Sequence, residues 1–99
     1  GDCTNIPNAI GALPKAGVFA AAQGEVAAAN IAADLLGSER AHFDGHGFCF
    51  LELPGEKVAY VEGDFYAEPR PAVTLTAADD EQFRAKQAYE QDRLAAWLG

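Results

Sequence analysis

The sequence predicts a small α+β fold: a long buried helix, then an antiparallel hairpin or a small three-stranded sheet, then a C-terminal helix. Three observations predict it. Residues 15–36 form an alanine-rich apolar stretch that ends at Gly37, and two strand-like runs flank Pro54-Gly55-Glu56. Residues 77–98 show helical spacing of their apolar positions. With 99 residues, the chain has room for one small core.

Composition limits the classes of partner. Hydrophobic residues make up 49% of the chain and charged residues 22%, an ordinary balance for a folded protein. The formal net charge of -8 disfavours binding to nucleic acid and to anionic lipid. No apolar run approaches the roughly 18 residues of a membrane-spanning helix. We expect a soluble protein, cytoplasmic or peripheral to a membrane, and membrane contact is not favoured.

Residues 1–14 mix Gly, Pro and Asn with isolated apolar residues and show no periodicity, which is typical of a loop. The chain starts at Gly1 rather than methionine, and its first residues contain no element that could begin a fold. We therefore expect a fragment or a processed chain.

The first helix is expected from Lys15 to Leu36. Pro14 suits a helix start, and Gly37 suits the left-handed residue that closes a helix. This stretch is apolar nearly all round, as in helices that are buried on more than one side. The rest of the chain is barely large enough to cover it. The sequence therefore predicts a missing partner surface, and self-association as a homodimer would cover it.

Two runs rich in aromatic and branched residues, 47–53 and 57–63, predict a hairpin. Alternation along the first run would place Cys49, Leu51 and Leu53 on one face. Phe48, Phe50 and Glu52 would then share the other face. A further short strand is expected at 73–75.

The last helix is expected over 77–98. Thr76 followed by Asp79 resembles a capping arrangement, and the acids at 79–81 suit the positive end of the helix dipole. Basic side chains along this stretch are matched by acids, unlike those of helices that lie on membrane surfaces.

The start of the first helix is a candidate binding site. Pro14-Lys15-Ala16-Gly17 opens this helix, whose first N–H groups are unpaired and favour an anion or an electron-rich ring oxygen. Lys15 adds a full positive charge. The alternative is an ordinary helix start with a solvated lysine.

Cys3 and Cys49 are too few for a disulfide scaffold or a cysteine zinc site. A lone cysteine on a strand is usually a small buried hydrophobe with an inert thiol. Alternatively, the neighbouring Gly45, His46 and Gly47 form a mobile, partly polar approach that would expose the Cys49 sulfur.

His42, Asp44 and His46 have a spacing that suggests metal ligands. Three candidates around a glycine are more often a turn, because a zinc site usually needs four ligands. The sequence therefore predicts no metal site.

Four segments together resemble a known family. They are GDCTNIP at 1–7, LPKAGVFAAAQGEVAAANI at 13–31, FDGHGFCFLEL at 43–53 and KVAYVEGDFYAEPRP at 57–71. In order and spacing they are similar to the C-terminal portion of sulfide:quinone oxidoreductases and flavocytochrome c sulfide dehydrogenases. These are FAD-dependent pyridine nucleotide-disulfide oxidoreductases, flavoproteins with two dinucleotide-binding domains. The resemblance implies that the chain is a fragment of such a flavoprotein.

The resemblance assigns cofactor-binding roles to five residues. Gly1 and Asp2 match the pair that ends a strand of the second FAD motif, with the aspartate bonded to the ribityl chain. Lys15, Ala16 and Gly17 match the residues beside the flavin, where a lysine and helix N–H groups stabilise negative charge on the reduced ring. The implied cofactor is FAD.

The same resemblance assigns a catalytic role to Cys49. With Asp44 and Gly45 it matches an Asp-Gly-x-x-x-Cys pattern that carries one of the redox cysteines handling sulfide sulfur. The partner cysteine would lie upstream of Gly1, and Cys3 does not match it. The acidic, balanced tail differs from the hydrophobic, basic tails of membrane-bound members, so the resemblance leaves the electron acceptor open.

The resemblance divides the chain by role into an FAD-contacting loop and helix, 1–37, and a C-terminal interface subdomain, 38–99, within one compact unit. The implied enzyme passes electrons from sulfide through cysteine and FAD to an acceptor. Its partners are the N-terminal FAD/NAD(P)-binding portion of the same protein and a second copy, and the isolated fragment is expected to be inactive. The alternatives are a non-catalytic dimerisation or interface module and the tail of an NADH dehydrogenase-type flavoprotein.

Overall fold

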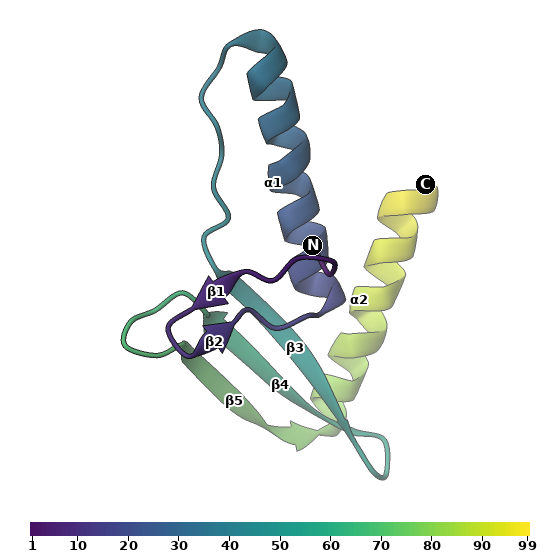
Figure 1. Ribbon diagram of the computed structural model, residues 1–99. Helices are drawn as coiled ribbons and strands as arrows, with labels where there is room; N and C mark the ends of the chain where they lie inside the picture. The colour runs from purple at the N-terminus through teal and green to yellow at the C-terminus, as the bar shows by residue number, and fades with distance from the viewer. The chain divides into compact units, whose positions relative to one another are not determined.

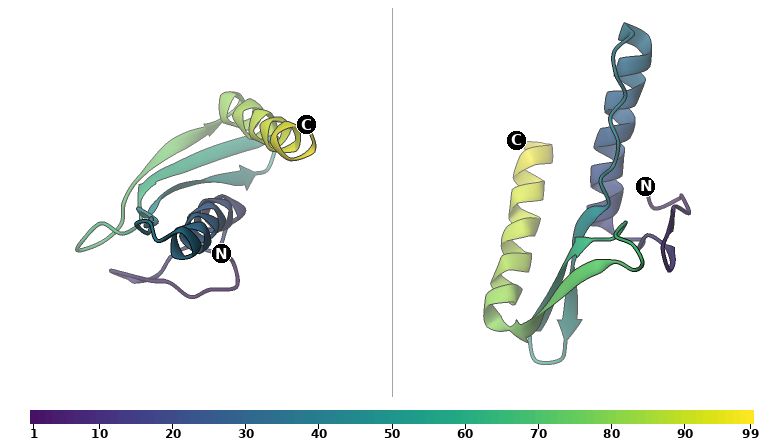
Figure 2. Two further views of the ribbon diagram at one scale, coloured as in Figure 1. Left: turned by 90° about the horizontal axis from the view of Figure 1, so that it is seen from above. Right: turned by 90° about the vertical axis from the view of Figure 1, so that its left-hand side faces the viewer.

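The computed structural model describes all 99 residues. Two helices and two antiparallel sheets confirm the α+β class (Figure 1). In chain order the elements are β1 (Pro7–Asn8), β2 (Gly11–Ala12), α1 (Gly17–Leu36), β3 (His46–Leu53), β4 (Lys57–Asp64), β5 (Ala72–Asp79) and α2 (Asp80–Leu98). Strands β1 and β2 pair with each other, and the larger sheet has the order β3-β4-β5 (Figure 2).

The chain divides into two compact units. The first, unit 1, contains Gly1–Phe48 and Glu62–Val73, and the second, unit 2, contains Cys49–Val61 and Thr74–Gly99. Neither helix combines the length and the apolar character needed to cross a membrane.

The N-terminal loop contains more structure than the sequence predicts. Pro7 pairs with Ala12 and Asn8 with Gly11, in an antiparallel ladder too short to produce a periodic pattern. Asn8 closes the turn, since its Oδ1 accepts from the N–H of Ile10 at 3.2 Å. Its Nδ2 donates to the carbonyl of Phe65 at 3.2 Å, which ties the loop to the residue after β4.

Helix α1 ends as predicted and begins two residues later. Gly37 has a φ of 71°, and its N–H donates to the carbonyl of Ala33. At the other end, Ala16 is extended, with φ -141° and ψ 151°, so the helix cannot include Lys15 and Ala16. Pro14 therefore precedes the helix instead of occupying its first turn.

The prediction of a buried helix is wrong for this chain. Only Phe19 and Ala33 of α1 are buried, whereas Ile31, Leu35 and Leu36 are 64%, 81% and 82% exposed. Ninety-nine residues cover a single stripe of a helix of this length, and the apolar side chains of its last turns face solvent.

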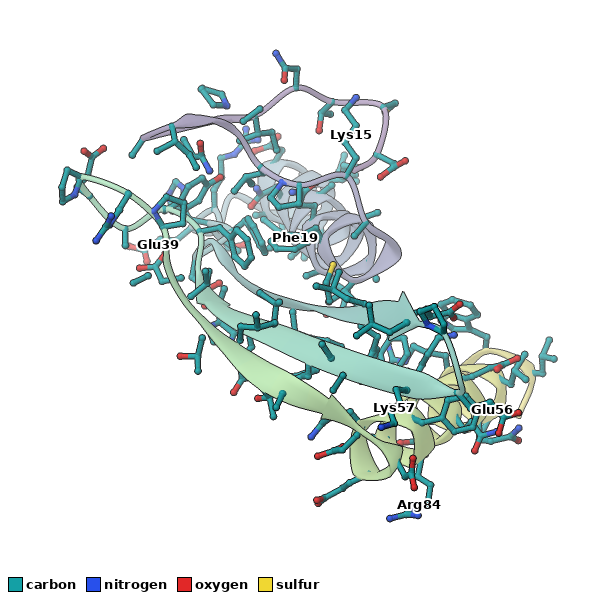
Figure 3. The ribbon with its side chains drawn as sticks, turned by 90° about the horizontal axis from the view of Figure 1, so that it is seen from below. Lys15, Phe19, Glu39, Glu56, Lys57 and Arg84 are labelled. Atoms are coloured by element: carbon teal, nitrogen blue, oxygen red, sulfur yellow. The ribbon has the colours of Figure 1, made fainter.

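Aromatic rings form the core of unit 1. The ring centroid of Phe19 lies 4.9 Å from that of Phe65 and 6.3 Å from that of Phe43, both in edge-to-face geometry. The Phe43 ring in turn lies 6.0 Å from Tyr66. Phe19 is 1% exposed and points inward from α1 (Figure 3).

Strands β3 and β4 confirm the predicted hairpin. Gly55 and Glu56 in its loop both have positive φ, 81° and 57°. The predicted third strand exists as β5 and is longer than 73–75. At Gly63 of β4 the backbone of β5 comes so close that an added Cβ would lie 2.1 Å from the carbonyl oxygen of Ala72.

Helix α2 begins three residues later than predicted, because residues 77–79 belong to β5. Asp79, not Thr76, caps the helix: its Oδ1 accepts from the N–H of Gln82 at 2.8 Å. Asp80 and Glu81 occupy the first turn, where the acids match the helix dipole as expected.

Unit 2 packs α2 against one face of its strands. The Phe50 ring lies 5.3 Å from Tyr60 and 6.2 Å from Tyr89 of α2, and Lys86 forms an ion pair with Glu52. Phe50 and Glu52 therefore share a face, as their alternation predicts.

The guanidinium of Arg93 lies over the Tyr89 ring, 5.8 Å from its centroid. Beyond Arg93 the large apolar side chains of the helix are exposed to solvent: Trp97 is 69% and Leu98 82% exposed.

Candidate functional site

A small pocket lies at the start of α1. Gly1, Asp2, Lys15 and Ala16 all line it, with the aromatic side chain of Phe19 among the other lining residues. The pocket is partly open to solvent, and the space within it is about 10 Å³, room for about one water molecule. The structure therefore brings together four of the five residues that the sequence analysis assigns to a cofactor.

A tight turn brings the first residues to the helix. The N–H of Thr4 donates to the carbonyl of Gly1 at 2.9 Å, and the Thr4 hydroxyl donates to the same oxygen. An added Cβ on Gly1 would lie 3.8 Å from the Cβ of Ala20, in ordinary contact with the first turns of α1. Asp2 is exposed and lies at the pocket.

The helix start at this pocket is uncapped. Ala16 has no side chain that could accept a hydrogen bond, and the first turn contains no acidic residue. The first intrahelical bond is donated by the N–H of Ala20 to the carbonyl of Ala16, at 3.0 Å. The N–H groups of Gly17–Phe19 come before it and lack a partner within the helix. No side chain of the helix's own cap or first turn therefore offsets the positive potential at this end.

Lys15 adds to that potential. It lies on the loop that leads into α1 and is exposed (Figure 3). Neither the ion pair of Arg40 with Asp34 nor that of Lys86 with Glu52 involves it. In a chain of charge -8, the pocket combines a free ammonium, helix N–H donors and one carboxylate acceptor. Such a set can bind a polar group that carries negative charge at one end and hydroxyls at another.

Gly17 does not line the pocket. It is the first residue of α1, and an added Cβ would meet nothing within 4 Å. Within this chain, nothing requires glycine there.

Cys49 lies on β3 in unit 2 and is half-buried with a free thiol. It does not line the pocket at α1. Cys3, also free, is exposed on the N-terminal loop. The sequence left open whether the Cys49 thiol is buried and inert or exposed. The observed half-burial lies between these two alternatives.

Asp44 organises the turn before β3. Its Oδ1 accepts from the N–H of His46 at 2.9 Å, and Gly45 has a φ of 80°. His42, Asp44 and His46 border an open hollow against α1, of about 430 Å³. No group of three His, Cys, Asp or Glu side chains in the structure is arranged to hold a metal ion.

Sequence reasoning missed several contributors to the pocket, Thr4 and Leu13 among them. Thr4 closes the turn that positions Asp2, and its signal was a hydroxyl three residues after Gly1. Leu13 is 7% exposed and lines the pocket, but an isolated leucine in a loop gives no periodic signal.

Comparisons with protein-family models, with curated proteins and with solved structures give no match to this chain.

Proposed function

We propose that this chain is the C-terminal, flavin-contacting portion of an FAD-dependent oxidoreductase similar to sulfide:quinone reductase. One observation carries the proposal. Gly1 and Asp2, at one end of the N-terminal loop, and Lys15 and Ala16, at the other, line one pocket at an uncapped helix start. These are the residues that the family resemblance assigns to FAD.

The donor set at the pocket fits the cofactor. The Lys15 ammonium and the N–H groups of the first turn of α1 suit the electron-rich edge of a flavin ring. The Asp2 carboxylate suits the hydroxyls of a ribityl chain. FAD bound there would supply the two-electron redox chemistry.

The chain supplies only an edge of such a site. A space of about 10 Å³ holds about one water molecule and cannot enclose a flavin ring. We therefore assign the remaining walls to the N-terminal FAD/NAD(P)-binding portion of the same protein. In this proposal the chain orients the ring and stabilises its charge, and the isolated chain is inactive.

Cys49 is the proposed sulfur-handling residue, working with a cysteine of the N-terminal portion. Its free, half-buried thiol on β3 supports this role. Electrons from sulfide would pass from the cysteine pair to the flavin and on to an acceptor.

The test uses the full-length protein that contains this chain. It is expected to purify with bound FAD, and sulfide added without oxygen is expected to bleach the flavin absorbance. Cys49→Ser should abolish bleaching by sulfide, and Cys3→Ser, the matched control at an exposed free cysteine, should leave it unchanged.

Two results would contradict the proposal. A full-length protein that binds no flavin would remove the cofactor assignment. Bleaching by sulfide at the wild-type rate in Cys49→Ser would remove the catalytic assignment. If NADH bleaches the flavin of the wild-type protein faster than sulfide does, the alternative of an NADH dehydrogenase is favoured.

One structural feature favours the alternative of a non-catalytic interface module. Ile31, Leu35 and Leu36 form an uncovered apolar end of α1, which a partner surface would bury. A flavin-free full-length protein that self-associates through these residues would support that alternative.

A further inference from the structure

We propose that the outer edge of β5 pairs with the β5 edge of a second copy of this chain, so that the sheet continues through both copies. This inference does not depend on the proposed flavin function. In the order β3-β4-β5, strand β5 is terminal, and no strand pairs with its outer side (Figure 2). Every residue from Ala72 to Ala77 is exposed. The strand therefore presents a row of backbone N–H and C=O groups to solvent.

This edge lacks two of the features that keep natural edge strands apart. Such strands usually carry a charged side chain, a proline or a bulge. Between Pro71, before the strand, and Asp79, its last residue, β5 has neither a charge nor a proline. Its centre, Val73-Thr74-Leu75-Thr76, consists mostly of β-branched residues, which favour an extended backbone.

A second copy fits this edge better than an unrelated protein. An antiparallel strand edge is self-complementary, because a two-fold axis exchanges the donors and acceptors of the two strands. Each copy has a charge of -8, so most of its surface repels another copy. The uncharged run along β5 is a surface where two backbones can approach without placing like charges opposite each other.

Leu75 marks the centre of the proposed pairing. It is 66% exposed in the middle of the uncharged run. A two-fold axis near Leu75 would bring the two Leu75 side chains together as a cross-strand pair. Pairing of one short strand buries less than the roughly 1,600 Å² of a standard interface, so we expect a dimer that dissociates on dilution.

The experiment is sedimentation equilibrium of the full chain over a range of concentrations. Wild type is expected to show a monomer–dimer equilibrium. Leu75→Lys should raise the dimer dissociation constant by about tenfold or more, because two ammonium groups would face each other across the axis. Leu75→Glu should do the same, and an equimolar mixture of Leu75→Lys and Leu75→Glu should restore association.

Controls separate this edge from the two exposed helix ends. Leu36→Lys on α1 and Leu98→Lys on α2 each change a leucine that is 82% exposed. Both should associate like wild type, and circular dichroism should show an unchanged fold in all variants. A wild type that stays monomeric at the highest concentration would overturn the proposal. Dissociation caused by Leu36→Lys or Leu98→Lys but not by Leu75→Lys, or no restoration in the mixture, would also overturn it.

Discussion

Gly47 lies directly against the ring of Phe19. An added Cβ on Gly47 would stand 2.4 Å from the Cζ atom of that ring, far inside van der Waals contact. Phe19 is 1% exposed and is held by Phe43 and Phe65, so its ring has little room to move away. The glycine at the start of β3 is therefore what allows the side chain of α1 to fill the core of unit 1.

Replacing Gly47 with alanine is expected to destabilise the chain. Overpacking of a filled core typically costs about 1–3 kcal/mol, and we expect a loss in that range for Gly47→Ala. Chemical denaturation measures it. Gly24→Ala is the matched control, because a Cβ there meets nothing within 4 Å. In the interior of α1 that change should stabilise by roughly 0.5–1 kcal/mol, and equal effects of the two variants would contradict the packing at Gly47.

Replacing Asp79 with alanine should remove the cap of α2. Loss of an N-cap costs about 0.5–2 kcal/mol, because the N–H of Gln82 loses its acceptor. Thermal unfolding with circular dichroism detects the change. Thr76→Ala serves as the control, since Thr76 lies within β5 and caps nothing. A larger loss at Thr76 than at Asp79 would support the capping arrangement predicted from sequence alone.

The ion pair between Lys86 and Glu52 should contribute little to the free energy of unfolding. The two side chains are 40% and 66% exposed, and exposed pairs are worth about 0–1 kcal/mol. Lys86→Gln should therefore change the free energy of unfolding by less than about 1 kcal/mol, with the difference shrinking at high salt. A larger, salt-independent loss would mean that the aliphatic part of Lys86 packs against unit 2.

Replacing Lys15 should slow flavin reduction in the full-length protein without destabilising the fold. In the full-length protein, Lys15→Gln is expected to slow sulfide-dependent flavin reduction at least about tenfold, because one charged donor is lost. Lys57→Gln, which removes an exposed lysine of β4, is the matched control. Neither variant should destabilise the 99-residue chain, since Lys15 takes part in no ion pair and its removal relieves repulsion at the positive end of α1. Equal flavin reduction rates in the two variants would contradict a role for Lys15.

Local sequence signals were sufficient to predict several structural elements. Pro54-Gly55-Glu56 determined the hairpin because positive φ is needed in its loop, and Gly37 ended α1 because glycine adopts the left-handed conformation without strain. These features depend on a few adjacent residues, so the sequence alone determines them.

Tertiary contacts decided the rest. Periodicity shows that α1 is apolar but not which of its residues become buried. Only Phe19 and Ala33 are fully buried, and at Phe19 the reason is that the rings of Phe43, before β3, and Phe65, after β4, pack against it. Pairing of β5 extends the strand through Asp79 and so moves the start of α2 beyond Thr76. The pocket that joins Asp2 to Lys15 likewise depends on how the N-terminal loop folds back on α1, since a loop without periodicity gives no signal for its path.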